Sequence, residues 1–232
     1  MSRRFFVETP IETDEVLLAG SEAHHLIHVM RAKAGDEVVL FDGSGAEFSA
    51  HVAQIGRNEV RCEVVSRTEI DRELPFQLTL GVALPKGERQ RWLVEKAVEL
   101  GVTEIVPLVT ARSVAQPTGH AIARLKRAVI EASKQCGRNC LMRIGPPAPL
   151  NQYLANTGID ELCLIAIPDS ESRQLGGSRN SYRIAIGPEG GFTGEEIHQA
   201  RDSGWQSYSL GPRILRTETA ALALTSVIVN ID

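Results

Sequence analysis

The sequence has no long apolar run and no closely spaced pair of cysteines. Its longest purely apolar stretch, Leu162–Ile167, is far too short to span a bilayer, and its first residues lack the apolar core of a signal peptide. The four cysteines are scattered over 232 residues without a CxxC pair, which argues against a disulfide framework. We therefore expect a cytoplasmic protein with reduced thiols and no membrane partner.

The chain also lacks the strong positive charge of proteins that coat nucleic acid. Its net charge is −4 at pH 7, and residues 1–72 carry 13 acidic against 8 basic side chains. Residues 111–143 are the exception, because they contain seven basic side chains and one acidic one. This run offers either a local surface for a polyanion or an ordinary solvated helix face. The overall composition, 43% hydrophobic and 23% charged, is typical of a globular protein.

Signatures of metal and phosphate binding are missing as well. His24 and His28 are four residues apart, but no cysteine or carboxylate cluster accompanies them. We therefore predict no metal site and expect these histidines to pack against the surrounding fold. Neither a GxxxxGKS/T nor a GxGxxG pattern occurs, which argues against a P-loop or a dinucleotide-binding loop.

The pattern of apolar residues changes near residue 73. Before it, short alternating segments predict strands at 3–7, 37–41, 47–55 and 59–65, with one helix that begins after a Ser21 N-cap. The polar stretch 67–75 is typical of a linker. Beyond it the expected elements alternate, with strands at 76–84, 104–109, 161–167, 182–187 and 207–211 and helices at 88–100, 118–136, 193–203 and 217–229. The sequence thus predicts an α/β protein with a small barrel or sandwich over 1–72 and a mainly parallel α/β domain over 73–232.

Three unusual loops follow strands of the second region. Open α/β sheets bind ligands beyond the carboxyl ends of their strands, so the loops beginning at 168, 187 and 211 are candidates for a site. The second loop, GPEGGF, contains three glycines that let the backbone approach a ligand closely. Its Glu189 would repel a phosphate but suits a cationic ligand, such as a sulfonium, or a ligand hydroxyl.

The third loop, LGPRILRTETA, combines an arginine with the start of a helix. Arg216 precedes Thr217, a plausible N-cap, and Glu218 falls in the first helical turn. A helix N-terminus and a guanidinium directed into one crevice favour an anionic substrate. The alternative is a simple surface pair between Arg216 and Glu218.

At these residues the chain resembles the ribosomal RNA small subunit methyltransferase E family, SPOUT-class enzymes that methylate N3 of a uridine in 16S ribosomal RNA. The resemblance spans nearly the whole length. It rests on six segments, 24–36, 86–107, 112–113, 131–144, 186–197 and 210–220. Within them Lys134 and Cys136 depart from the family pattern, so no role is carried over to those two side chains.

The resemblance implies a PUA-like RNA-binding β-barrel over 1–72 and an S-adenosylmethionine-dependent SPOUT domain with a deep trefoil knot over 73–232. It also implies a homodimer whose active site lies at the subunit interface. By position, the residues expected to bind S-adenosylmethionine are those of the three loops, namely Ile167, Pro168, Gly187, Pro188, Glu189, Gly190, Gly191, Leu210, Gly211, Ile214 and Leu215.

Uridine N3 is an imide whose proton must leave before or during attack on the methyl group. We expect Arg216 to stabilise the resulting anion, and either Glu218 or Glu189 to accept the proton. The expected partner is 16S ribosomal RNA, within the 30S subunit, held by basic side chains around the crevice. The candidates are Arg3, Arg4, Lys86, Arg89, Arg112, Arg124 and Arg138.

Two other functions fit parts of this pattern. One is a related SPOUT enzyme that acts on a ribose 2′-hydroxyl or a transfer RNA base. The other is a non-catalytic RNA-binding factor of ribosome assembly, which would tolerate degenerate donor loops. The loops are intact here, which disfavours the second alternative.

Overall fold

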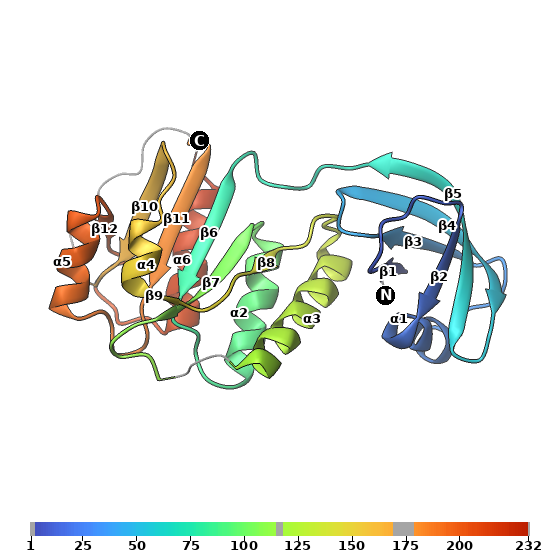
Figure 1. Ribbon diagram of the computed structural model, residues 1–232, viewed down its shortest axis with the longest axis horizontal. Helices are drawn as coiled ribbons and strands as arrows, with labels where there is room; N and C mark the ends of the chain where they lie inside the picture. Colours follow the sequence, from blue (N-terminus) through green and yellow to red (C-terminus); the bar gives the residue numbers. More distant parts are fainter. Residues whose placement is uncertain (1–2, 115–117, 169–178, 232) are drawn as a thin grey trace. The chain divides into compact units, whose positions relative to one another are not determined.

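The computed structural model describes residues 3–114, 118–168 and 179–231. Of the first candidate loop it therefore covers Pro168, and the continuation at 169–171 lies outside the described residues. The chain separates into two compact units (Figure 1). Unit 1 comprises Met1–Glu73 and Ser133–Leu141, and unit 2 comprises Leu74–Ala132 and Met142–Asp232. The return of the chain to unit 1 at Ser133 is a contact between distant segments that no local pattern predicts.

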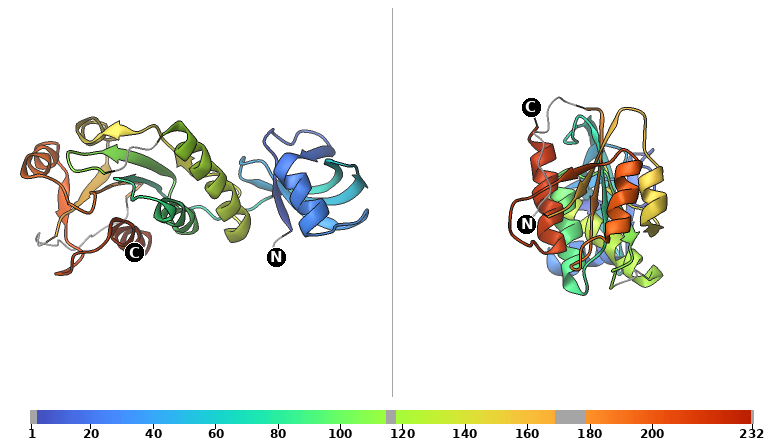
Figure 2. Two further views of the ribbon diagram at one scale, coloured as in Figure 1. Left: turned by 90° about the horizontal axis from the view of Figure 1, so that it is seen from below. Right: turned by 90° about the vertical axis from the view of Figure 1, so that its left-hand side faces the viewer.

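Unit 1 is built on a five-stranded sheet that curls around its own core (Figure 2). The strand order is β1-β3-β4-β5-β2. Along β4, alternate residues such as Phe48, Ala50 and Val52 are buried, so one face of the strand supplies the core. The elements are β1 (Arg4–Phe6), β2 (Glu15–Ala19), α1 (Gly20–His24), the π-helix η1 (His25–Val29), β3 (Glu37–Phe41), β4 (Ala46–Ile55) and β5 (Glu59–Glu69).

Several expectations for unit 1 are wrong in detail. Strand β2 was not predicted, and β5 extends to Glu69, so part of the expected linker is strand. The N-cap position of α1 is Ala19, without a side-chain cap, and Ser21 lies inside the helix. His24 and His28 are exposed instead of packed against the sheet, whereas the neighbouring His25 ring lies 5.9 Å from that of Phe5.

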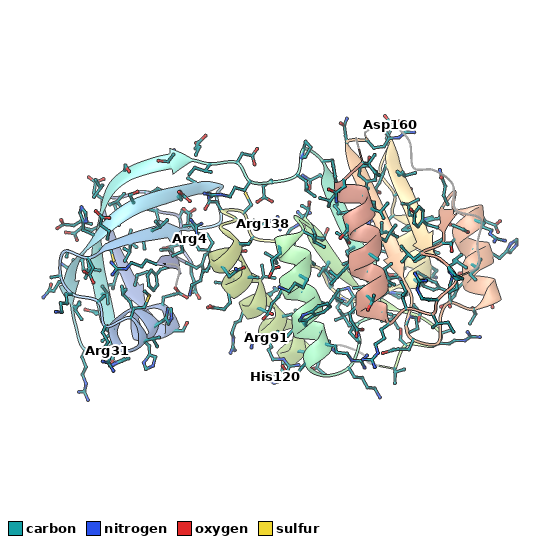
Figure 3. The ribbon with its side chains drawn as sticks, turned by 180° about the vertical axis from the view of Figure 1, so that it is seen from behind. Arg4, Arg31, Arg91, His120, Arg138 and Asp160 are labelled. Carbon is teal, nitrogen blue, oxygen red and sulfur yellow. The ribbon has the colours of Figure 1, made fainter. Side chains whose placement is uncertain are left out.

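Ion pairs attach the segment Ser133–Leu141 to the rest of unit 1. Arg138 pairs with Glu73, and its side chain is only 5% exposed. Lys134 Nζ lies 3.0 Å from a Glu22 oxygen, and both side chains are largely buried. Figure 3 labels Arg138 and Arg4, and Arg4 donates to Asn139 Oδ1 at 2.6 Å. These contacts therefore attach the segment to the sheet and helix of unit 1.

Unit 2 contains a parallel sheet with the order β12-β10-β11-β6-β7-β8, and β9 pairs with β7. Every described strand pair in this sheet is parallel, which confirms the mainly parallel sheet. Strand order alone does not define a knot, so the trefoil knot stays a prediction. The elements are β6 (Gln77–Val82), α2 (Glu88–Glu99), β7 (Glu104–Val109), α3 (Gly119–Cys136), β8 (Arg143–Ile144), β9 (Ala148–Pro149), α4 (Leu150–Ala155), β10 (Glu161–Ala166), β11 (Ser181–Ile186), α5 (Gly194–Asp202), β12 (Gln206–Tyr208) and α6 (Thr217–Val229).

Helices cover both faces of this sheet. Figure 2 shows α2 and α6 on one face and α4 and α5 on the other. Tyr153 of α4 points toward the sheet, where its hydroxyl donates to the carbonyl oxygen of Ile184 at 3.0 Å. The Tyr153 ring lies beside Gly81 of β6. Burial raises the pKa of the Tyr153 hydroxyl well above its ordinary value, so this group remains a donor. Across the described residues, no helix combines the length and apolarity needed to cross a bilayer.

Most helices of unit 2 lie where the sequence predicts them, although the exact residues at their ends and some short elements differ from the prediction. Gly101 follows α2 with a φ of +82°, the left-handed conformation expected at that position. Helix α6 has Arg216 at its N-cap position, so the expectation of a Thr217 cap is wrong. Short elements β8, β9 and α4 were not predicted, because two to six residues carry too little periodicity.

The cap of α5 provides a test of local stability. Thr193 Oγ1 accepts from the Glu196 amide at 3.2 Å, and a Glu196 oxygen accepts from the Thr193 amide at 2.7 Å. Thr193→Ala should lower the free energy of unfolding by about 1 kcal/mol, because an amide in the first turn loses its acceptor. Urea unfolding measures the loss, and Thr193→Ser, which keeps the hydroxyl, should stay close to wild type. Equal losses in both variants would contradict the cap.

Candidate functional site

Three parallel strands bring the three candidate loops together. Strands β12, β10 and β11 are neighbours, so the segments that follow them emerge at one edge of the sheet. There they enclose a cavity of about 380 Å³. Every residue that we expected to bind S-adenosylmethionine lines it, namely Ile167, Pro168, Gly187, Pro188, Glu189, Gly190, Gly191, Leu210, Gly211, Ile214 and Leu215.

The cavity also has walls that the sequence did not single out. Phe192 lines it from the segment before α5, Ile197 from α5 itself, and Tyr208 from the end of β12. Tyr208 could have been inferred, because it is the last residue of a strand whose loop was already a candidate. Thr217, expected only as a cap, lines the cavity as well. The walls are thus mostly apolar, as in many small-molecule sites.

Side-chain hydrogen bonds fix the loop between β11 and α5. Thr217 Oγ1 donates to the Gly187 carbonyl oxygen at 3.2 Å, and Arg112 Nη1 donates to the Gly190 carbonyl oxygen at 2.7 Å. Glu196, which is buried, accepts from the Ala111 amide at 2.8 Å as well as from the cap of its own helix. The loop is therefore held from α6, from the segment after β7 and from α5.

Two glycines leave the cavity open. Gly191 has a φ of +67° and Gly211 a φ of +96°, both in the region that favours glycine. A Cβ added at either position would meet no atom within 4 Å. Since both residues line the cavity, their bare backbone leaves space that a ligand can occupy.

Beside the cavity, one arginine is shared by two carboxylates. Arg89 Nη1 of α2 lies 3.5 Å from Oε1 of Glu189 and 3.5 Å from Oε1 of Glu218. The Glu189 side chain is 43% exposed and lines the cavity. The Glu218 side chain is only 8% exposed, and its buried Oε2 has no hydrogen-bond partner among the residues that the structure describes. Arg89 therefore connects the glycine loop to the first turn of α6.

Arg216 is exposed at the start of α6. The alternative of a surface pair with Glu218 is wrong, because Glu218 is buried and its charged partner is Arg89. In the described ranges no side-chain hydrogen bond or ion pair of Arg216 is found. Its guanidinium is thus available to an anion.

The side chains expected to bind RNA fall into three groups. Lys86 and Arg124 of unit 2 and Arg3 of unit 1 are exposed. Arg89 and Arg112 are engaged at the edge of the cavity, as described above. Arg4 and Arg138 are wrong candidates, because their buried guanidiniums pair with Glu47 and Glu73 inside unit 1. In the chain that the structure describes, no group of three or more histidine, cysteine or acidic side chains is placed to hold a metal ion.

Comparison with protein families matches both units. The model of the RNA methyltransferase domain matches residues 72–229, and the model of the RNA methyltransferase PUA domain matches residues 18–65. The range 72–229, matched by the methyltransferase model, contains all three loops of the cavity.

Relatives of known sequence or structure cover nearly the whole chain. Ribosomal RNA small subunit methyltransferase E of Bacillus subtilis is 30% identical over 97% of this chain and 95% of its own length. The crystal structure of a ribosomal RNA small subunit methyltransferase E from Neisseria gonorrhoeae bound to S-adenosyl methionine has a TM-score of 0.90 at 30% identity, covering 98% of this chain and 97% of that one. A Legionella pneumophila methyltransferase in complex with the same cofactor has a TM-score of 0.90 at 32% identity, with the same coverage.

Proposed function

Because the chain belongs to the ribosomal RNA small subunit methyltransferase E family, it is an S-adenosylmethionine-dependent RNA methyltransferase, and we propose that it forms 3-methyluridine by methylating N3 of one uridine in 16S ribosomal RNA. The observation that carries this proposal is the glycine-lined cavity with an available arginine, Arg216, at the start of the adjoining helix. Membership of this family supports 16S ribosomal RNA as the substrate. The cavity and the charged side chains at its edge support the transfer of a methyl group from S-adenosylmethionine to uridine N3.

The cavity suits the cofactor in size and lining. A volume of about 380 Å³ lies in the range of small-molecule sites, and open space at Gly191 and Gly211 lets the backbone contact the ligand. Apolar Ile214 and Leu215 would pack against the adenine, and backbone groups of Gly187–Gly191 would bind its polar atoms. When bound, S-adenosylmethionine supplies an electrophilic methyl group on a sulfonium whose departure leaves a neutral thioether.

The protein's own task is then to hold the uracil in line with that methyl group and to remove the N3 proton. Arg216 would stabilise the uracil anion, since a guanidinium near a developing negative charge lowers its free energy. Glu189 would accept the proton, because of the two candidate carboxylates it is the one that lines the cavity. Glu189→Gln should accordingly lower single-turnover methyl transfer more than Glu218→Gln does, and the reverse order would reassign the base.

Arg89 would act as a positioning residue for these carboxylates. Arg89→Met should lower kcat by about tenfold to a hundredfold with little change in the KM for RNA, because Glu189 and Glu218 lose the cation that they share. Arg91→Met is the matched control, since Arg91 lies two residues along α2, is exposed and, among the described residues, forms its ion pair with Glu95. A rise in KM with unchanged kcat would instead indicate that Arg89 binds RNA phosphate.

We further propose a homodimer that acts in the cytoplasm on 16S ribosomal RNA within the 30S subunit. Trp92 of α2 is 45% exposed and Val227 of α6 is 37% exposed, and these two helices pack side by side on one face of the sheet. Exposed apolar side chains on adjacent helices suit an interface between identical subunits. Equilibrium sedimentation should give twice the chain mass of 25.3 kDa, and a single chain mass would contradict the dimer.

Nucleoside analysis tests the product. 16S ribosomal RNA is incubated with protein and S-adenosylmethionine, as naked RNA and as 30S subunits, and its nucleosides are analysed by mass spectrometry. We expect 3-methyluridine. Appearance of a 2′-O-methyl nucleoside would favour the related ribose-methylating enzymes, and absence of any methylated nucleoside from both substrates would favour a non-catalytic assembly factor.

A further inference from the structure

Unit 1 presents one surface where basic and imidazole side chains gather between Glu22 and Asp36, two acidic residues that are engaged by Lys134 and by the Lys33 amide. It is formed by α1, η1 and the turn that follows them, and we call it the π-helix face. Residues 23–35 contain no aspartate or glutamate, although residues 1–72 carry 13 acidic against 8 basic side chains. The exposed members of the face are His24, His28, Val29, Arg31 and Lys33.

Five other cations of unit 1 are engaged by its own carboxylates, whereas Arg3, Arg57 and Arg61 form no ion pair among the described residues. The pairs are Arg4 and Arg72 with Glu47, Arg67 with Glu69, Lys134 with Glu22, and Arg138 with Glu73. The Arg31 and Lys33 side chains, by contrast, have no hydrogen bond or ion pair to any residue that the structure describes. Of the five basic side chains of unit 1 that form no ion pair among the described residues, Arg31 and Lys33 lie on the π-helix face together with the exposed His24 and His28.

The backbone of this face is unusual and well anchored. The Met30 amide donates to the His25 carbonyl oxygen at 2.9 Å, five residues back, and the Ala32 amide donates to that of Leu26 at 3.1 Å, six residues back. Arg31 lies at the resulting bend with a φ of +51°, which is uncommon for a residue with a side chain. Buried Leu26 anchors the turn to the core. π-Helical turns and such backbone outliers concentrate at functional sites.

Two imidazoles also lie close together at the surface of this face. The rings of His24 and His28 lie 4.6 Å apart with an interplanar angle of 46°. Neither ring is buried, and 53% of the neighbouring Val29 is exposed. Unpaired RNA bases stack on side chains of this kind, including histidine.

We propose that the π-helix face is the RNA-binding surface of unit 1. Arg31 and Lys33 contact backbone phosphates, and His24 and His28 stack against an unpaired base. The choice of RNA as the polyanion rests on the proposed function, whereas the location of the surface rests on the exposed cations and rings. Of the two arginines that the sequence suggested for this role, Arg4 is paired with Glu47 and is replaced by Arg31 and Lys33, whereas Arg3 is exposed and stays a candidate.

Filter binding of full-length protein to deproteinised 16S ribosomal RNA between about 50 and 200 mM salt tests the location. Arg31→Glu and Lys33→Glu should each weaken binding about tenfold or more near 0.1 M salt and reduce the slope of log affinity against log salt by about 1. His24→Ala combined with His28→Ala should weaken binding about fivefold or more, with the slope unchanged, because stacking releases no counterions.

Arg67→Glu is the matched control, because Arg67 is exposed on β5 of the same unit and the charge change is the same. Unchanged affinity for S-adenosylmethionine and unchanged thermal midpoints show that the variants are folded. Equal effects of Arg31→Glu and Arg67→Glu, or wild-type affinity in both Arg31→Glu and Lys33→Glu, would overturn the proposal.

This assay requires no methyl transfer, so it separates the two proposals. Loss of RNA affinity as expected, without any 3-methyluridine from the wild-type protein, would contradict the proposed function alone. Formation of 3-methyluridine together with undiminished RNA affinity of the π-helix-face variants would contradict the location alone.

Discussion

Arg216→Ala should lower the rate of methyl transfer about a hundredfold to a thousandfold while leaving the affinity for S-adenosylmethionine within about twofold of wild type. Arg216 does not line the cavity, so the cofactor loses no direct contact. It is exposed at the N-cap position of α6, where its guanidinium is available to a uracil anion. Removing the cation raises the free energy of that anion in the transition state. Single-turnover transfer of a labelled methyl group and calorimetric titration of the cofactor measure the two quantities.

Arg213→Ala provides the matched control for this experiment. Arg213 is exposed in the same loop and does line the cavity, so its loss should affect cofactor binding more than the chemical step. The rate of Arg216→Ala should also rise more steeply with pH than that of wild type, because a higher pH supplies the N3 anion that the arginine no longer stabilises. Near-wild-type turnover of Arg216→Ala would remove this residue from the mechanism.

Gly81→Ala should lower the free energy of unfolding by about 3 kcal/mol, and with it the thermal midpoint by about 6 to 12 °C. Gly81 is buried in β6, and a Cβ there would lie 2.5 Å from Cε1 and 2.8 Å from the hydroxyl of Tyr153. The ring cannot move aside easily, because it is buried and its hydroxyl donates to the Ile184 carbonyl oxygen. Calorimetry of the full chain measures the change.

Two further variants show whether the clash is the cause. Gly194→Ala, at a glycine whose added Cβ would meet no atom within 4 Å, should leave the midpoint close to wild type. Tyr153→Leu removes the ring, so in its presence Gly81→Ala should cost much less than it does alone. Additive losses in the double variant would show that the destabilisation comes from elsewhere in β6.

The candidate site was more predictable than much of the fold because it depends on strand ends and glycine loops. Once strands at 161–167, 182–187 and 207–211 were inferred, a parallel sheet required their loops to meet, and the cavity lies there. The roles of charged side chains were less predictable. Arg89 and Arg138 look alike in the sequence, yet one is shared by two carboxylates at the site and the other is buried with Glu73.

The misassigned elements have a common physical origin. Ser21 and Thr217 have the composition of N-caps, but the turns of backbone that precede them decide where each helix begins. The expectation that His24 and His28 pack against the fold is wrong, because both rings are exposed at the widened turn His25–Val29. Neither local composition nor helical spacing encodes that extra residue per turn.

The discontinuity of unit 1 has a consequence for the order of events during translation. Its sheet is complete by Glu69, but Asn139 and Arg138, which bind Arg4 and Glu73, are synthesised about seventy residues later. Although domains generally fold in the order of their synthesis, this unit acquires its last contacts only when Leu141 has left the ribosome. Nascent chains arrested before that residue should therefore be degraded by protease more readily than chains arrested well beyond it, even though both contain the entire sheet.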